Sequence, residues 1–173
     1  MRRLFLLRHA KSSWDHPELA DEQRPLNTRG QRDAPRMGRA ISERHSTLTL
    51  HVSSAVRAQQ TAEGVAVGWL GEQPPVCHTD RALYTFSGRQ LLSWIQRQPP
   101  SPAPLVLVSH NPGLTDLINT LDPSAHLDNL PTAAWAELEL AVDDWSSVKP
   151  GCGELNYLLR PRELSALADG EVA

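Results

Sequence analysis

The feature that most constrains the fold of this chain is a pattern that occurs twice, in which four apolar residues are followed by polar residues that include a histidine. Leu4–Leu7 is followed by Arg8 and His9, and Leu105–Val108 is followed, one serine later, by His110. Short apolar runs with polar flanks are typical of buried β-strands. Ligands of open α/β sheets bind outside the carboxyl ends of the strands, so both histidines are expected at a binding site.

The rest of the chain alternates between strand patterns and helix patterns. Strands are predicted at residues 4–7, 47–52, 76–78, 105–108, 132–140 and 153–159. Helices are predicted at about 28–44, 55–70, 88–98 and 114–121, where apolar residues recur at spacings of three and four. This alternation predicts one α/β domain over residues 1–173, with a mostly parallel sheet covered by helices on both faces. The last dozen residues are predicted to form a loose tail or a terminal helix.

The first predicted helix contains two signals for its start that disagree. Asn27 or Thr28 is a suitable N-cap residue for a helix that begins directly after it. Pro35, however, is tolerated only near the first turn of a helix, because proline has no N–H to donate. The proline therefore favours a start several residues later.

Length, charge and cysteine content restrict the class of protein. The 173 residues suffice for one domain with a real core, and the formal net charge of −3 argues against a nucleic-acid partner. No stretch approaches the roughly 18 apolar residues of a membrane span. Cys77 and Cys152 have no metal-ligand or disulfide spacing, and Met1–Leu7 is too short for a signal-peptide core. We expect a cytoplasmic protein without a membrane partner.

Three predicted strands end in residues that suit phosphate chemistry. Arg8 and His9 follow the first strand, Arg57 follows the second, and His110 follows the fourth. Parallel strands bring their carboxyl ends to one edge of a sheet, so these side chains are expected to converge. Guanidinium groups bind phosphoryl oxygens in a bidentate manner, and a neutral imidazole attacks phosphorus to give a phosphohistidine. A second histidine would stabilise the phosphoryl oxygens in the transition state.

Other chemistries find less support in the sequence. No HExxH motif or Cys/His cluster has metal-ligand spacing, and the sequence contains neither a P-loop nor a GxGxxG motif. Ser53, Ser54 or Ser109 near a histidine would suggest a hydrolase triad, but none of these serines lies in a GxSxG motif. The remaining histidines are expected to be structural or surface residues: His16, His45, His51, His78 and His126.

Taken together, these patterns resemble the histidine phosphatase superfamily with its phosphoglycerate mutase-like fold, and more narrowly the SixA-type phosphohistidine phosphatases. The resemblance covers residues 3–160. Each motif alone is weak, but their order and spacing are specific. The matching motifs are LFLLRHAKSSW (4–14), Asp21-x-x-Arg24-Pro25-Leu26-Asn27-x-x-Gly30, Ser53-Ser54-x-x-Arg57-Ala58-x-x-Thr61, Leu83-Tyr84 and VSHNPG (108–113).

The resemblance implies a three-layer α/β/α sandwich that requires no metal and no organic cofactor. It also implies a phosphate pocket made of four residues: Arg8, His9, Arg57 and His110. In such a pocket His9 accepts the phosphoryl group. Ser13 and Asn111 stand beside these residues in the sequence and are expected to contribute to substrate binding.

One departure from the superfamily pattern bears on the substrate. Many members place an acid near the Leu-Tyr motif to protonate the leaving group, but Tyr84 is followed by Thr-Phe-Ser without a carboxylate. The nearest acids are Asp80 upstream and Asp15 and Asp21 in the first loop. An imidazole leaves phosphohistidine already protonated and needs less help than an alkoxide. We therefore expect a phosphatase that favours protein phosphohistidine.

Two alternatives remain open from the sequence. The first is a phosphatase of a small phosphate ester, and the second is a non-catalytic module that binds a phosphorylated ligand. Residues 58–109 are filled by two predicted helices and a strand, which leaves no room for a sizeable lid over the pocket. An open pocket admits a phosphorylated protein and a small ester alike, whereas a mutase needs a site closed to water.

Overall fold

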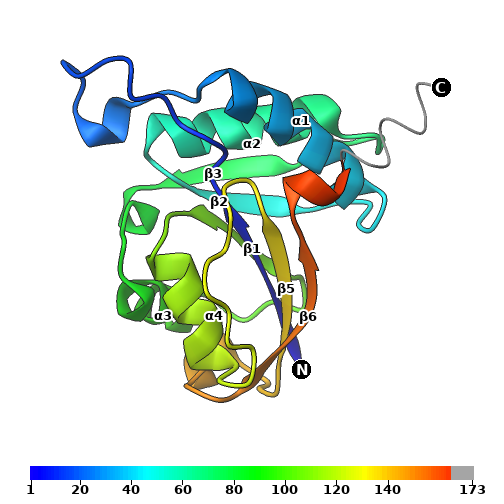
Figure 1. Ribbon diagram of the computed structural model, residues 1–173. Helices are drawn as coiled ribbons and strands as arrows, with labels where there is room; N and C mark the ends of the chain where they lie inside the picture. The colour runs from blue at the N-terminus through cyan, green and yellow to red at the C-terminus, as the bar shows by residue number, and fades with distance from the viewer. Residues whose placement is uncertain (165–173) are drawn as a thin grey trace.

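Within residues 1–164, which the computed structural model describes, six strands form one central sheet (Figure 1). The strand order is β3-β2-β4-β1-β5-β6. The strands are β1 Arg2–Arg8, β2 Thr49–Ser53, β3 Val76–Asp80, β4 Leu105–Ser109, β5 Trp135–Leu140 and β6 Gly153–Leu159. All six lie where the sequence pattern predicts a strand. Most of the predicted C-terminal tail lies outside the described residues.

The pairing of the strands explains why polar residues gather at one edge of the sheet. β1 pairs with β4, β4 with β2, and β2 with β3, all in parallel. β5 pairs antiparallel with β1, and β6 pairs antiparallel with β5. In this register Arg8 stands beside Ser109 and Ser53 beside Asp80, so the parallel strands end level with one another. The prediction of a mostly parallel sheet is confirmed.

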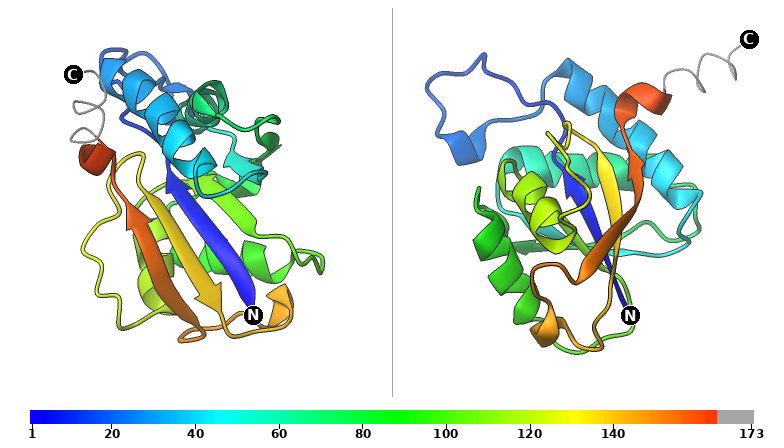
Figure 2. Two further views of the ribbon diagram at one scale, coloured as in Figure 1. Left: turned by 90° about the vertical axis from the view of Figure 1, so that its right-hand side faces the viewer. Right: turned by 60° about the horizontal axis from the view of Figure 1, so that its bottom comes forward.

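Helices cover both faces of the sheet, as Figures 1 and 2 show. The helices are α1 Thr28–Ser42, α2 Val56–Gly68, α3 Gly88–Gln96 and α4 Gly113–Leu121. β1 alternates between the two layers, because successive side chains of a strand point to opposite faces. Its Leu4 and Leu6 join the apolar cluster under α3 and α4, whereas Phe5 and Leu7 join the cluster under α1 and α2. The result is the expected three-layer α/β/α sandwich.

Helix α1 begins at the N-cap signal and not at the proline. The Asn27 side chain accepts a hydrogen bond from Gly30 N at 2.9 Å, and Pro35 lies inside the helix. The expectation of a later start is therefore wrong. α2 packs so closely at this point that a Cβ atom on Gly68 would lie 1.8 Å from the Pro35 carbonyl oxygen. Capping and helix packing together outweigh the one backbone hydrogen bond that Pro35 cannot make.

The close approach of α1 and α2 gives a first testable prediction, at Gly38. A Cβ atom there would lie 2.1 Å from Val65 O, so Gly38→Ala must push the two helices apart. We expect the free energy of unfolding to fall by about 2 kcal/mol, as is typical of overpacking. Urea unfolding measures this change.

The control is Gln31→Ala on the exposed side of the same helix, for which the change should stay within about 0.5 kcal/mol. Helix propensity by itself favours alanine over glycine by about 1 kcal/mol. A Gly38→Ala variant that is as stable as the wild type, or more stable, would contradict the described helix contact.

Candidate active site

The four residues predicted to form a phosphate pocket lie together at the carboxyl edge of the parallel strands. His9 follows β1, His110 follows β4, and Arg57 lies in the first turn of α2; all three are buried. Arg57 Nε lies 3.4 Å from His9 Nε2, and the ring centroids of His9 and His110 are 5.1 Å apart. Arg8 donates from Nη1 to Leu130 O at 3.0 Å. Burial, and then the positive charge of Arg57, lowers the pKa of Arg8.

The contacts of His9 fix which ring nitrogen carries the proton. His9 Nδ1 lies 2.8 Å from Ala10 O, and a carbonyl oxygen only accepts, so Nδ1 must be the protonated nitrogen. Thr61 holds this carbonyl in place by accepting a hydrogen bond from Ala10 N at 2.9 Å. Nε2 is thereby left with a lone pair that faces Arg57. Burial, reinforced by the charges of Arg57 and Arg8, lowers the pKa of His9 to about 3 and keeps the ring neutral.

Ser53, at the end of β2, orients His110 in a similar way. Ser53 Oγ lies 2.7 Å from His110 Nε2 and accepts a hydrogen bond from Ala55 N at 3.2 Å. With the Ser53 hydroxyl as the donor to Nε2, Ser53 Oγ both donates and accepts, and the ring proton of His110 resides on Nδ1. Among the described residues, His110 Nδ1 is buried without a hydrogen-bond partner. Burial lowers the pKa of His110 to about 3 and keeps the ring neutral, and in this tautomer Nδ1 is a donor without an acceptor.

The loop between β1 and α1 brings a carboxylate into the site. Its two ends are tied together, because Asn27 N donates to Lys11 O at 2.9 Å and Ser13 N donates to Pro25 O at 2.8 Å. Gly30 permits this closure, since a Cβ atom there would lie 2.2 Å from Lys11 O. In Figure 1 the loop is the dark blue segment that projects beyond α1 and α2.

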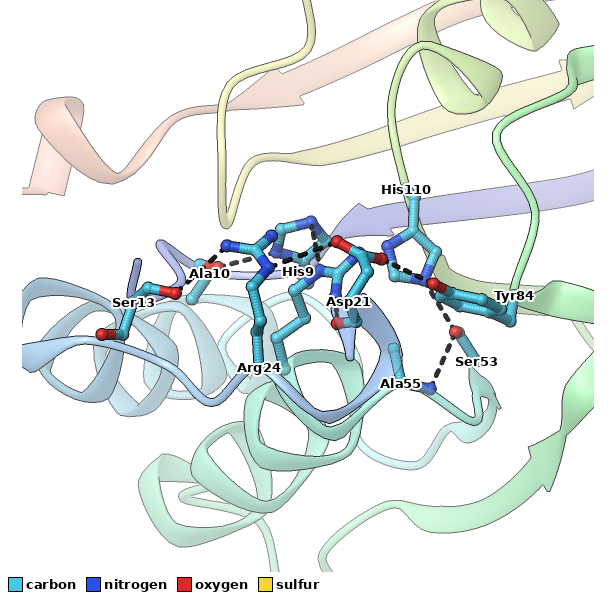
Figure 3. A network of polar contacts seen from close by, with 10 residues as sticks. His9, Ala10, Ser13, Asp21, Arg24, Ser53, Ala55, Tyr84 and His110 are labelled. Atoms are coloured by element: carbon cyan, nitrogen blue, oxygen red, sulfur yellow. Dashed lines mark hydrogen bonds and ion pairs between the residues drawn. The ribbon is translucent and has the colours of Figure 1, made fainter. Parts of the chain in front are cut away.

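Asp21, in the short 3-10 helix of this loop, is the carboxylate beside Tyr84 (Figure 3). Asp21 Oδ2 accepts from Tyr84 Oη at 2.5 Å and from Arg57 Nη2 at 3.0 Å. Asp21 O accepts from Arg57 Nη1 at 2.6 Å, and Oδ1 accepts from Arg24 Nε at 3.2 Å. No carboxylate adjoins Tyr84 in the sequence, but a loop that folds back supplies one in space.

The environment of Asp21 keeps its carboxylate ionised. Burial by itself would raise the pKa of Asp21, but hydrogen bonds from Tyr84, Arg57 and Arg24 outweigh it and lower the pKa to about 2. Of the two other acids that the sequence offered, Asp80 accepts from Trp94 Nε1 at 2.8 Å, and Asp15 is exposed. Of these three carboxyl groups, Asp21 is therefore the one that belongs to the site, and it is ionised near neutral pH.

Ser13 and Asn111 have contacts within the protein. Ser13 is buried in the first loop, where its hydroxyl accepts from Asp15 N at 3.1 Å. Asn111 donates from Nδ2 to Asn129 Oδ1 and Leu130 O, and its Oδ1 accepts from the backbone and side chain of Thr115. A side-chain amide makes four hydrogen bonds at most, so Asn111 has none left for a substrate. The geometry thus assigns Asn111 to holding the loop before β5 and does not support substrate binding.

Four residues of the site escaped the prediction from strand ends: Asp21, Arg24, Ser53 and Tyr84. Signals for them are present in the sequence, because Asp21 and Arg24 belong to one matching motif and Ser53 and Tyr84 to two others. Within residues 1–164, no group of three or more His, Cys, Asp or Glu side chains is arranged to hold a metal ion. The helices of the same range are too short or too polar to cross a membrane.

Comparisons with known proteins identify the family of this chain. The family model of the histidine phosphatase superfamily (branch 1) matches residues 4–81. An uncharacterized protein of Picosynechococcus sp. is 32% identical over 117 residues, which cover 64% of this chain and 67% of that protein. The chain belongs to the histidine phosphatase superfamily, and its enzymatic class is that of a phosphatase.

Two solved structures illustrate the breadth of this fold. The protein histidine phosphatase SixA complexed with tungstate superposes with a TM-score of 0.76 at 24% identity, over 94% of this chain and 99% of that chain. The mycobacterial glucosyl-3-phosphoglycerate phosphatase with VO3 superposes with a TM-score of 0.63 at 18% identity, over 91% and 98% of the two chains. These similarities confirm the predicted phosphoglycerate mutase-like fold.

The contact between Ser53 and His110 gives a second prediction. Ser53→Ala removes the hydroxyl that holds the proton on His110 Nδ1, so kcat/KM should fall about tenfold, the value of one hydrogen bond. The ¹⁵N chemical shifts of the His110 ring report the tautomer directly, and we expect them to change from Nδ1–H to a mixture.

The matched control is Ser54→Ala, since the Ser54 hydroxyl is buried without a hydrogen-bond partner among the described residues. This variant should keep the wild-type kcat/KM and the wild-type ring shifts of His110. Equal effects of the two substitutions would mean that Ser53 acts only through packing.

The lowered pKa of His9 gives a third prediction, for the pH dependence of the reaction. A base whose pKa falls from 6.5 to about 3 stays unprotonated as the pH drops through 6.5, and its reactivity is lost only near its new pKa. After correction for ionisation of the substrate phosphoryl group, kcat/KM should therefore show no inflection of its own between pH 8 and pH 5. An acidic limb centred near pH 6.5 would show that His9 titrates normally.

Proposed function

We propose that this phosphatase removes the phosphoryl group from phosphohistidine on a protein substrate, with His9 as the nucleophile. His9 Nε2 attacks phosphorus, the N–P bond of the substrate breaks, and the substrate imidazole leaves with the proton that it already carries. Water then attacks phospho-His9, which releases inorganic phosphate and returns neutral His9. The lone pair on Nε2, fixed by the bond from Nδ1 to Ala10 O, supports this role.

In this proposal the remaining pocket residues stabilise the transferred group. Arg8 and Arg57 bind the phosphoryl oxygens, and His110 donates to one of them from Nδ1. The orphaned state of His110 Nδ1 in the structure supports this role, because a buried donor without an acceptor is costly unless a ligand supplies one. The burial of Arg57 supports its role in binding the phosphoryl oxygens, because ion pairs are stronger away from water.

The observation that carries the choice of substrate is the ionised state of Asp21. Three donors, on Tyr84, Arg57 and Arg24, hold this carboxylate without a proton. An alcohol phosphate ester needs a proton donor for its alkoxide, whereas protonated phosphohistidine does not. SixA, to which the fold is similar, is described as a protein histidine phosphatase.

The alternative is a phosphatase of a small phosphate ester. One consequence of phosphate binding favours this alternative. A phosphate bound at Arg57 would displace the Asp21 carboxylate, and the pKa of Asp21 would then rise. The mycobacterial glucosyl-3-phosphoglycerate phosphatase shares the fold and acts on such an ester. A module that only binds phosphate would need the arginines but not a neutral histidine with an unprotonated Nε2.

Two further features complete the proposal. The sheet and both helical layers form one unit over the described residues, and we propose that residues 1–173 act as one domain. Cys77 and Cys152 are free thiols, which fits a reducing compartment such as the cytoplasm. The proposed partner is a phosphorylated protein.

A fourth prediction separates the two substrate classes. Of two peptides identical but for phosphohistidine or phosphoserine, the phosphohistidine peptide should have a kcat/KM at least about 10²-fold higher, the usual contribution of a missing general acid. Asp21→Asn should change both values by the same factor, because Asp21 delivers no proton in either reaction. Steady-state kinetics with release of inorganic phosphate measures both.

The control for this experiment is His9→Ala, which should abolish turnover of both peptides. A selective loss of phosphoserine turnover in Asp21→Asn would assign the acid role to Asp21 and favour the small-ester alternative. Comparable kcat/KM values for the two peptides in the wild type would contradict the proposal.

A further inference from the structure

Beside the reaction centre lies an open cavity of about 470 Å³ that the proposed chemistry does not use. Its walls come from the 3-10 turn after β3 and from helix α3. The lining residues are Arg81, Ala82, Tyr84, Arg89, Gln90, Ser93 and Arg97. Three of these seven residues are arginines, and the lining contains no carboxylate.

The helix geometry explains why the arginines share one cavity. Arg89, Ser93 and Arg97 are spaced by four residues along α3 and its C-cap, so they lie on one face of the helix. Arg81 joins them from the 3-10 helix Arg81–Leu83. Considered separately, Arg89 and Arg97 look like ordinary solvent-exposed residues of a helix. Together with Arg81, however, they line one cavity.

None of these three guanidinium groups lies within ion-pair distance of a carboxylate in the part of the chain that the structure describes. All three side chains are exposed, and none takes part in an ion pair with residues 1–164. Arg24, Arg44 and Arg57, by contrast, each contact a carboxylate. A cluster of unpaired like charges is unfavourable by itself and attracts anions.

The acid that precedes Arg81 in the sequence is hydrogen-bonded to other groups. Asp80 precedes Arg81, but its two oxygens accept from Ala82 N at 2.9 Å and from Trp94 Nε1 at 2.8 Å. Glu22 acts on Tyr84 only through its charge, and it raises the pKa of that phenol weakly compared with burial and Asp21. The positive character of the cavity comes from its lining, which holds three arginines and no carboxylate.

Tyr84 connects the cavity to the reaction centre. One side of this residue lines the cavity, while its hydroxyl donates to Asp21 Oδ2, which in turn binds Arg57. Its ring also lies against His110, with centroids 5.4 Å apart. A polypeptide that presents a phosphorylated side chain to His9 would pass Tyr84 and place its neighbouring residues over the arginines.

We infer that Arg81, Arg89 and Arg97 form a docking site for acidic side chains that flank the phosphohistidine of a protein substrate. This inference rests on the proposed function and adds its sequence preference. Carboxylates match the guanidinium groups in charge and in bidentate geometry. The contacts are exposed to solvent, so each contributes a several-fold effect at most, and they act on substrate binding.

The test uses two phosphohistidine peptides of equal length, one with three Glu residues beside the phosphohistidine and one with three Gln residues. At low salt the wild type should prefer the acidic peptide about tenfold in kcat/KM, through KM and not kcat. The preference should shrink in 0.5 M NaCl because salt screens exposed charges. In the double variant Arg89→Gln/Arg97→Gln it should fall to about twofold or less.

The matched control is Arg3→Gln/Arg162→Gln, which removes the same charge at two other exposed positions and should keep the tenfold preference. Equal kcat/KM values for the two peptides in the wild type would overturn the docking site and leave the proposed function intact. A preference that survives in Arg89→Gln/Arg97→Gln would also overturn it. Absence of turnover of both peptides would overturn the proposed function, and the docking site with it.

A further experiment tests whether the cavity binds small anions instead of acidic side chains. It compares a small monophosphate ester with the same ester carrying a second phosphate group. If the Arg89→Gln/Arg97→Gln variant loses only a preference for the second phosphate, and the peptide ratio is unchanged, the cavity serves small anions and the inference is wrong.

Discussion

The buried guanidinium of Arg57 is the interaction on which the rest of the site depends. It donates to His9 from Nε and to Asp21 from both Nη atoms. A charge buried to this extent requires a counter-charge, and Asp21 supplies it from the loop between β1 and α1. The same charge helps to keep His9 neutral. One arginine thus couples the loop, His9 and the proposed phosphate site.

The Asp21 carboxylate and a phosphoryl group are both anions, and they compete for the guanidinium of Arg57. In the structure the Asp21 carboxylate binds this guanidinium, and it also accepts hydrogen bonds from Tyr84 and Arg24. A phosphoryl group that reaches Arg57 must compete with a carboxylate that is already hydrogen-bonded. The preference for a phosphoramidate or an ester as substrate therefore depends on whether Asp21 gains a proton when the phosphoryl group replaces it at Arg57.

The strand ends could be predicted from the sequence, and the contacts made by the loops could not. Arg8, His9 and His110 follow apolar runs, and parallel pairing brings such positions to one edge whatever the loops do. Asp21 reaches Tyr84 through a loop whose path depends on a hydrogen-bond network, which leaves no periodic signal. The start of α1 shows the same limit, because Pro35 is tolerated through contacts with a helix that is distant in sequence.

The contact between Asp21 and Arg57 also has a consequence for the end of the catalytic cycle. Inorganic phosphate is chemically close to the transferred group, and an arginine pocket without an internal anion would hold it tightly. Here the Asp21 carboxylate already binds Arg57 Nη2, so at this atom the free energy of product binding would be the difference between two anions. A pocket built in this way favours release of its product and limits product inhibition.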